Sequence, residues 1–498
     1  MTRTHQLLAA LTTLLVLAVA APAARADVDQ EAMFQDDDEL LYSDEQHVLG
    51  RLDELAALGA DRIRVTVLWK GVAPKPGSRR RPDFDASNPD AYSPGAWTRY
   101  DRILVGALDR GMQVNFNVTG PAPLWATDEA APRDDIRTTW KPSATEFAQF
   151  VAAVGRRYDG THEGLPRVDY WSIWNEPNHA SWLTPTWDRR KGKSFEASAL
   201  SYRELLDAGY AALATTDHGR DTILVGDTAP SGDDRAGIKA YMKPLVFLRA
   251  LYCVDTRGKR LRGSRAKLLD CGGSARRFRR DHPALFKATG FAHHPYQLLT
   301  APSVEPRDKD IVTMAVLGRL TRFVDRALRR YGSRRKLPLY LTEFGYQTRP
   351  DPRGVKLATH GEYLNEAEWM ASRNKRVRSM AQFLLVDDGP PIGDTFQSGL
   401  VLRNGKKKPA YGAYAVPVWV WGKGSTRKVW SVLRPAAAGE AAQGVVLVRQ
   451  KGTKEWDIAG VVDAKGPRNV ISATVDARRG DSLRVAYGPL VSRTVKVK

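Results

Sequence analysis

A long alternation of two sequence patterns constrains the fold of this 498-residue chain more than any other feature. From about residue 34 to residue 417, short β-rich runs alternate with stretches of helical periodicity, the pattern of parallel strands joined by crossover helices. The expected strands are residues 33–41, 62–69, 113–118, 168–174, 222–225, 290–294, 337–343 and 380–386. Eight strands separated by helices predict a (β/α)8 barrel.

The segments between these strands have the spacing of helices that cover a barrel. In the first of them, Val48, Leu52, Leu55 and Leu58 recur at three- and four-residue intervals, so one face can pack on the strands. A doubly wound open sheet is the alternative, but no G-x-G-x-x-G fingerprint follows the first strand. The expected helices are residues 46–58, 96–110, 144–158, 195–215, 310–331 and 361–378.

The pattern changes after Pro417. Short runs of alternating polar and apolar residues follow one another, separated by glycine and charged residues, which is typical of antiparallel strands. These runs are residues 418–421, 428–433, 444–449, 456–462, 469–475, 482–487 and 491–497. We therefore predict a barrel domain over residues 27–417 and a small C-terminal antiparallel β-sandwich domain over residues 418–498.

The first 26 residues have the composition of a secretory signal peptide. An apolar run from Leu7 to Ala20 ends at the small residues of Ala24-Arg25-Ala26, before an acidic stretch. The run is short for a membrane span and no second candidate follows it, although an uncleaved anchor is the alternative. The sequence predicts a secreted, extracellular protein with no membrane span once the signal is removed.

Cys253 and Cys271 are the two cysteines of the chain. In an oxidising compartment they can pair, and closing so short a loop stabilises a fold by about 3 kcal/mol. Two free thiols are the alternative, whereas two cysteines alone do not make a metal site. We predict a disulfide bond between them.

The chain is strongly basic, with 76 Lys and Arg against 56 Asp and Glu and a formal net charge of +20. The arginines lie in scattered clusters such as residues 276–280 and 334–336, without an aromatic-interleaved RNA-binding motif, so nucleic acid is not an expected partner. An acidic glycan or a negatively charged cell envelope would suit this charge. A solvated basic surface is the simpler interpretation.

Glu176 follows the expected fourth strand in the run Trp174-Asn175-Glu176-Pro177. The carboxyl ends of the strands form the active-site face of a (β/α)8 barrel, so an Asn-Glu pair there has the position of a catalytic group. Strict alternation would aim the two side chains apart, and a bulge or a strand-end twist must therefore turn both inward. A glutamate that caps the next helix is the alternative.

A second carboxylate, Glu343, ends the expected seventh strand and shares a face with Leu339 and Leu341. Burying an unpaired carboxylate is costly, so a function explains its place better than packing does. Strands four and seven face each other across a barrel, which allows the roughly 5 Å separation of a retaining glycosidase pair. Glu343 would be the ionised nucleophile and Glu176 the protonated acid and base.

Other side chains at the same end of the barrel can bind a sugar. His294 and Tyr296 follow strand six and can hydrogen-bond hydroxyls or the nucleophile. Trp69, Trp125 and Trp182 follow strands two, three and four, where indole rings either stack on the apolar faces of sugars or fill the core. No further histidine or carboxylate nearby has the spacing of metal ligands, so neither a metal nor a cofactor is expected.

Three segments, taken together, resemble a known group of enzymes. Trp171-Ser172-Ile173-Trp174-Asn175-Glu176-Pro177, His294-Pro295-Tyr296 and Leu341-Thr342-Glu343-Phe344-Gly345 resemble, in this order, clan A glycoside hydrolases of the cellulase-like family 5 and the xylosidase-like family 39. The resemblance implies that Asn175 holds the sugar 2-hydroxyl, that Tyr296 bonds the nucleophile, and that Arg64 lies beneath Glu343. These enzymes usually also carry a pocket-floor tryptophan on strand eight, which is missing from residues 382–388.

The sequence therefore predicts a retaining glycoside hydrolase that acts as a monomer on β-linked glycans or glycosides. A catalytically inactive barrel that binds carbohydrate or the cell envelope is one alternative. A transglycosylase is another, because the same residues serve when a sugar rather than water reaches the intermediate.

Overall fold

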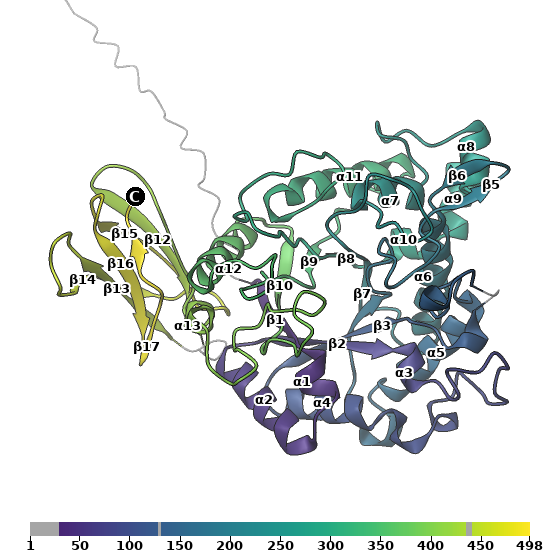
Figure 1. The fold of residues 1–498 in the computed structure, drawn as a ribbon, viewed down its shortest axis with the longest axis horizontal. Helices are drawn as coiled ribbons and strands as arrows, with labels where there is room; N and C mark the ends of the chain where they lie inside the picture. The colour runs from purple at the N-terminus through teal and green to yellow at the C-terminus, as the bar shows by residue number, and fades with distance from the viewer. Residues whose placement is uncertain (1–28, 128–130, 435–440) are drawn as a thin grey trace, which may run out of the picture.

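A computed structural model of the chain describes residues 29–127, 131–434 and 441–498. Figure 1 shows a barrel of parallel strands ringed by helices, with antiparallel sheets packed beside it. The signal peptide expected at residues 1–26 lies outside the described residues. No helix formed by the described residues combines the length and the apolar content that crossing a bilayer requires.

The barrel is closed and contains a strand from each of the eight expected runs. Every neighbouring pair is parallel, in the order β1-β10-β9-β8-β7-β4-β3-β2, and β1 pairs with both β2 and β10. The strands are β1 (Glu31–Gln35), β2 (Arg62–Leu68), β3 (Gln113–Thr119), β4 (Tyr170–Ile173), β7 (Thr222–Thr228), β8 (Gly290–His293), β9 (Leu339–Leu341) and β10 (Val377–Phe383). The predicted (β/α)8 barrel is thus confirmed.

The helices surround these strands, with short excursions between them. The α-helices are α1 (Asp37–Leu41), α2 (Glu45–Ala57), α3 (Trp69–Val72), α4 (Thr98–Leu108), α5 (Ala144–Arg157), α6 (Ala197–Thr215), α7 (Pro244–Leu251), α8 (Gly263–Leu268), α9 (Ala275–Asp281), α10 (Ala284–Lys287), α11 (Leu317–Arg330), α12 (Leu357–Ser372) and α13 (Pro409–Ala415). The loops carry the 3₁₀ turns η1 (Pro89–Ala91), η2 (Pro94–Ala96), η3 (Leu124–Ala126), η4 (Asp134–Ile136), η5 (His162–Gly164) and η6 (Met314–Val316), and the hairpin β5 (Asp188–Arg190) and β6 (Lys193–Phe195).

Several expected boundaries differ from those of the structure, and two of them show the reason. The first strand ends at Gln35, because the Asp36 side chain accepts from the backbone N–H of Glu39 and starts α1 where a strand was expected to continue. The helix expected over residues 361–378 spans Leu357–Ser372, since its last residues belong to β10. Hydrophobic periodicity alone does not separate a helix end from the buried strand that follows it.

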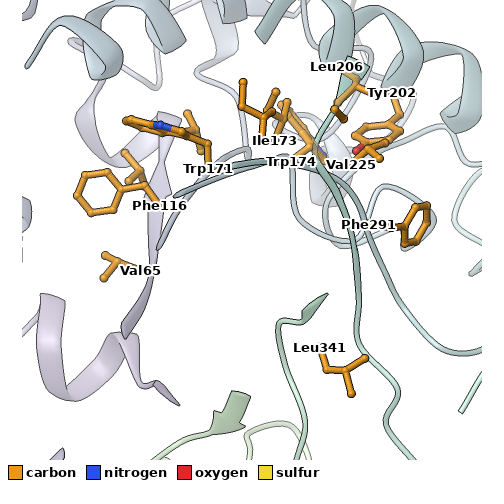
Figure 2. Close-up of a cluster of buried hydrophobic side chains, with 14 of the residues drawn as sticks. Val65, Phe116, Trp171, Ile173, Trp174, Tyr202, Leu206, Val225, Phe291 and Leu341 are labelled. Atoms are coloured by element: carbon orange, nitrogen blue, oxygen red, sulfur yellow. The ribbon is translucent and has the colours of Figure 1, made fainter. Parts of the chain in front are cut away.

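Apolar side chains on the outer face of the strands form the main core. Figure 2 shows part of this cluster, in which Ile173 and Val225 lie beside Tyr202 and Leu206 of α6. The strand residues labelled there are Val65, Phe116, Trp171, Ile173, Val225, Phe291 and Leu341. The helices therefore bury the alternate residues of each strand and leave the others to point into the barrel.

The inside of the barrel is polar above an aromatic base. Tyr170 and Tyr340 pack edge to face, with ring centroids 6.0 Å apart, near the amino ends of β4 and β9. Arg64 of β2 and Asn115 and Asn117 of β3 have no exposed surface, and Asn115 is paired with Tyr170 in the strand register. A buried guanidinium requires negative partners, so this polar interior predicts acidic groups at the carboxyl ends of the strands.

The C-terminal strands form two antiparallel sheets that share a small apolar core, as predicted for a β-sandwich. One sheet has the order β11-β12-β15, and the other has β14-β13-β16-β17 with β18 paired to β16. The strands are β11 (Val418–Trp421), β12 (Thr426–Val432), β13 (Gln443–Arg449), β14 (Asp457–Asp463), β15 (Val470–Asp476), β16 (Ser482–Tyr487), β17 (Leu490–Val491) and β18 (Val495–Lys496).

Ion pairs join the sandwich to the amino end of the barrel. Arg434 pairs with Glu368 of α12 and donates to the Tyr414 carbonyl at 2.8 Å. Arg468 pairs with Asp61, which lies directly before β2. A cavity of about 500 Å³ lies at this junction. It is lined by residues of both units, among them Asp61, Glu368, Arg434 and Arg468.

The predicted disulfide is present between Cys253 and Cys271. It links the turn after α7 to the turn after α8, and both cysteines are buried. The bond therefore fixes a long excursion between β7 and β8.

Candidate active site

The end of β4 turns Asn175 and Glu176 into the mouth of the barrel. Trp174 and Glu176 have positive φ values of 68° and 37°, which rotate the chain out of strand alternation. The turn is held by backbone hydrogen bonds, from Trp174 to the Val118 carbonyl and from Glu176 to the Asp227 carbonyl, both 2.9 Å long. This is the strand-end twist that the sequence requires for both side chains to face the same space.

Glu343 reaches the mouth by a different route from the one expected. Leu339 and Leu341 belong to the core between strands and helices, while Tyr340 points into the barrel. The expectation that these leucines share the inward face with Glu343 is therefore wrong. The strand ends at Leu341, and Glu343, two residues later, lies in the mouth with 7% of its surface exposed.

Three polar side chains converge on the two glutamates. Arg64 donates to Glu343 Oε1 at 2.7 Å, and the Tyr296 hydroxyl donates to Glu343 Oε2 at 3.0 Å. His294 Nδ1 lies 2.9 Å from Glu176 Oε1 and 3.5 Å from Glu343 Oε2. One oxygen of each carboxylate and a ring nitrogen of His294 lie within 4.8 Å of one another. The structure thus brings the two predicted catalytic residues together.

Arg64 organises the floor of the site. Besides Glu343, its guanidinium donates to Asn175 Oδ1 at 2.8 Å and to Gln35 Oε1. Its side chain has no exposed surface, so these contacts replace its hydration. Gln35, at the end of β1, was not among the predicted site residues, and a lone glutamine at a strand end gives little signal in a sequence.

Asp227 is a third carboxylate that the sequence analysis missed. It lies beneath the two glutamates, 1% exposed, with Oδ1 3.4 Å from His294 Nε2 and Oδ2 3.6 Å from Arg64 Nη2. Asn117 donates to it at 2.9 Å, and the Thr342 hydroxyl donates to Oδ1. It therefore contacts the partners of both glutamates.

The backbone around Asp227 explains why it was missed. The expected fifth strand stops at Val225, because Gly226-Asp227 is typical of a turn, yet β7 continues to Thr228. Gly226 has φ 115°, and a Cβ there would lie 2.6 Å from the Ala292 carbonyl oxygen. The register with β8 shifts at this point, so a bulge aims Asp227 into the barrel.

The charges of the site shift the protonation of His294. Burial lowers the pKa of its imidazole, but the carboxylates of Glu343, Asp227 and Glu176 together raise it to about 9. Burial raises the pKa of Asp227, and the Arg64 and His294 charges outweigh it and bring that pKa far below the usual range. The buried imidazole is therefore a cation at neutral pH.

The two glutamates are affected in opposite directions. Burial raises the pKa of Glu176, but the hydrogen bond and the charge of His294 outweigh burial and lower it. Burial also raises the pKa of Glu343, and there it exceeds the lowering by His294 and Arg64. The prediction that Glu176 holds the proton is based on burial and on the neighbouring charge, and the hydrogen bond to His294 acts against it.

Two of the three predicted tryptophans belong to the core and not to the walls of this site. Trp69 is 1% exposed and packs on Phe147 and Phe150 of α5, with ring centroids 5.5 and 5.9 Å apart. Trp125 lies edge-on to Trp69 and donates to the Pro74 carbonyl. The structure places both in the core, while Trp182 is half-buried in the loop after β4.

Phenylalanines lie where the resemblance leads one to expect a tryptophan on strand eight. Phe383 ends β10, with its ring perpendicular to that of Tyr296 at 6.2 Å. On its other side it meets Phe396 at 5.2 Å, and Phe396 is 48% exposed. An aromatic row therefore runs from the side chain that holds Glu343 to the surface.

Glu176, His294 and Glu343 also have the geometry of a metal-ligand set. A metal ion would require His294 to lose its proton, since both ring nitrogens of an imidazolium carry hydrogens. The Arg64 guanidinium already provides a positive charge 2.7 Å from Glu343. The donor set therefore fits a cation poorly, and the geometry favours acid and base chemistry by the carboxylates.

Comparisons with known proteins support the fold. No family model matches the sequence, and no curated protein matches it either. A family 39 glycoside hydrolase from Bacteroides cellulosilyticus superposes with a TM-score of 0.50 at 13% identity, over 91% of this chain and 81% of that one. A glucosidase from Croceicoccus marinus gives 0.51 at 11% identity, over 94% and 97%. A monomeric β-xylosidase from Caulobacter crescentus gives 0.50 at 14% identity, over 93% and 97%.

These similarities, together with the closed barrel, show that the chain has the fold of clan A glycoside hydrolases. They are too distant in sequence to carry a substrate or a mechanism across. Those conclusions rest on the residues of the site itself.

Proposed function

We propose that the protein is a secreted, monomeric glycoside hydrolase that cleaves β-glycosidic bonds with retention, using Glu343 as nucleophile and Glu176 as acid and base. The observation that carries this proposal is the approach of a buried carboxylate, Glu343, and a half-buried one, Glu176, to within 4.8 Å at the mouth of the barrel. Retaining enzymes place their carboxyl groups roughly 5–5.5 Å apart, whereas inverting enzymes need roughly 6.5–9.5 Å to admit a water molecule.

In the first step, a Glu343 oxygen attacks the anomeric carbon while the bond from that carbon to the leaving oxygen breaks. Arg64 and Tyr296 hold Glu343 in a fixed orientation, so the attack needs little reorganisation. Arg64 also occupies Oδ1 of Asn175, which leaves the Asn175 amide NH₂ to donate to the sugar 2-hydroxyl.

The leaving oxygen needs a proton, and His294 is the group that holds one. The His294 proton lies on a 2.9 Å hydrogen bond to Glu176, so it can move to Glu176 as the leaving oxygen gains negative charge. In the second step Glu176 takes a proton from water, the water oxygen bonds to the anomeric carbon, and Glu343 is released. Glu176 thus acts as acid and then as base.

Azide, which can replace either the missing nucleophile or the water, distinguishes the role of Glu343 from that of Glu176. Wild type and the variants Glu343→Ala, Glu176→Ala and Glu305→Ala are assayed on a panel of aryl β-glycosides and polysaccharides, with and without azide. Glu305, in a loop after β8, pairs with Arg319 and is exposed, so its variant is the matched control.

We expect Glu343→Ala to lose turnover and to form an α-glycosyl azide, because azide then attacks in place of the nucleophile. Glu176→Ala should form a β-glycosyl azide, because azide replaces water in the second step. NMR of the wild-type reaction should show the β-anomer first. Equal turnover by wild type and Glu343→Ala, or an α-anomer formed first, would contradict the proposal.

A further inference from the structure

An exposed aromatic pair lies next to the proposed acid and base. Tyr241, in the segment between β7 and α7 (Figure 1), stacks on His179 with ring centroids 3.7 Å apart and an interplanar angle of 24°. Tyr241 is 41% exposed although one face of its ring is covered by the imidazole. The pair therefore presents an aromatic surface to solvent.

The backbone fixes this pair at a short distance from Glu176. The N–H of His179 donates to the Glu176 carbonyl at 2.8 Å, so both residues belong to one turn.

A buried asparagine joins the two loops that carry the pair. Asn178, with no exposed surface, accepts from the Ala229 N–H at 2.9 Å and donates to the Met242 carbonyl at 2.7 Å. The Met242 N–H donates back to the Asn178 carbonyl at 2.8 Å. Residues on both sides of the stack are thus tied to each other through main-chain groups.

The Tyr241 segment is also closed on itself. Asp233 donates its N–H to the Tyr241 carbonyl at 2.7 Å and accepts from the Tyr241 N–H at 2.8 Å. A Cβ on Gly232 would lie 2.4–2.5 Å from main-chain atoms of residues 241–243, so only glycine permits this approach. The backbone that carries the Tyr241 ring is therefore held in one conformation before any ligand binds.

The position of the pair defines what it can contact. A general acid protonates the oxygen of the leaving group, so the leaving group lies beside Glu176. Tyr296 and Phe383 line the side of Glu343 instead. A flat ring with one open face, next to the acid, can stack on a ring of the leaving group through its apolar C–H face.

On the basis of the proposed function, we propose that Tyr241, backed by His179, is the binding platform for the leaving group, and that this group is a sugar residue. The substrate is then a β-linked oligosaccharide or polysaccharide rather than a simple alkyl glycoside. An aryl leaving group has the same flat shape, and the experiment below distinguishes the two.

The test compares Tyr241→Ala and Tyr241→Phe with wild type on three substrates that carry the same preferred sugar. The substrates are a β-linked disaccharide, a nitrophenyl β-glycoside and a methyl β-glycoside. Tyr42→Ala is the matched control, since Tyr42 is 56% exposed and follows α1.

We expect Tyr241→Ala to lower kcat/KM for the disaccharide by about tenfold, mainly through KM, and to leave the methyl glycoside unchanged. Tyr241→Phe should retain wild-type values, because it keeps the ring. Equal losses on all three substrates would show that Tyr241 positions Glu176. A loss confined to the nitrophenyl glycoside would show that Tyr241 binds an aryl leaving group and not a sugar. Either result overturns the inference.

The proposed function and this inference fail in different ways. If wild type turns over none of the glycosides, the proposed function fails and the inference with it. If wild type and Tyr241→Ala are equally active on the disaccharide while Glu343→Ala is inactive, the inference alone fails. An unchanged midpoint of thermal unfolding for Tyr241→Ala ensures that the comparison reports binding.

Discussion

Buried charged side chains are paired differently at the two ends of the barrel. At the amino end, Arg62 lies nearest to Glu31, Arg434 to Glu368 and Arg468 to Asp61, while the further pairs of Arg62 with Asp169 and of Arg468 with Glu31 are 3.8 Å long. At the carboxyl end, the carboxylates of Glu176, Asp227 and Glu343 share Arg64 and His294. Both ends are built mainly from arginine and acidic residues, so composition does not distinguish them.

The difference lies in how many partners each charge has. At the amino end each acid has one arginine as its nearest partner, and two of the three pairs join the sandwich to the barrel. Where three acids share a guanidinium and an imidazole, a proton can move between groups at low cost. We infer that catalysis is confined to the end where the charges are shared.

The largest effect is expected from replacing Arg64 of β2. Arg62 of the same strand, two residues earlier, pairs with an acid of the amino end and provides the comparison. Arg64→Met removes the cation from Glu343 and Asp227, so kcat/KM should fall by about 10²–10³-fold. Arg62→Met is the control and should leave kcat unchanged in the folded protein. Equal losses of kcat in both variants would break the distinction between the ends.

A stability effect of the next size is expected at the junction of barrel and sandwich. Arg434→Met leaves Glu368 buried without its partner, and the free energy of unfolding should fall by about 3 kcal/mol. Denaturant unfolding measures this loss, and kcat in the absence of denaturant should stay at the wild-type value. A change in kcat with unchanged stability would contradict the assigned role.

A shift in pH dependence is expected from Asp227→Asn. Asp227 is one of the groups that raise the pKa of His294 to about 9, so losing its charge should lower that pKa. His294 is protonated below its pKa, and the alkaline limb of kcat/KM should therefore move to lower pH by about one unit. An unmoved alkaline limb, with activity otherwise intact, would show that His294 does not hold the transferred proton.

The smallest effect is expected for Arg468→Ala. Its pair with Asp61 is about one-fifth exposed on both sides, so solvent screens the interaction. The free energy of unfolding should fall by less than about 1 kcal/mol. A loss as large as that of Arg434→Met would mean that solvent exposure does not determine how much each of the two pairs contributes to the free energy of unfolding.

The sequence was sufficient for the barrel because eight strands and their helices repeat a period that few folds share. Glu176 and Glu343 were predictable since each follows a strand at the end where active sites form. Their approach within one pocket required only that the barrel close.

Asp227 and Tyr241 were not predictable for physical reasons. Asp227 enters the site through a bulge after a glycine, and such a bulge has the sequence of a turn. Tyr241 is held by main-chain hydrogen bonds across two loops, which leave no pattern in side chains. Trp69 was assigned to the pocket because residue type does not tell a core indole from a rim indole.

The pairing of β1 with β10 joins Glu31 to Ser379, residues separated by most of the barrel sequence. The ribosome must therefore synthesise nearly all of the barrel before its seam can close, and until then both outer strands present unpaired main-chain groups. A chain stopped ahead of β10 would expose these groups permanently and would be prone to self-association. Chaperone dependence should accordingly concentrate on the interval before the seam forms.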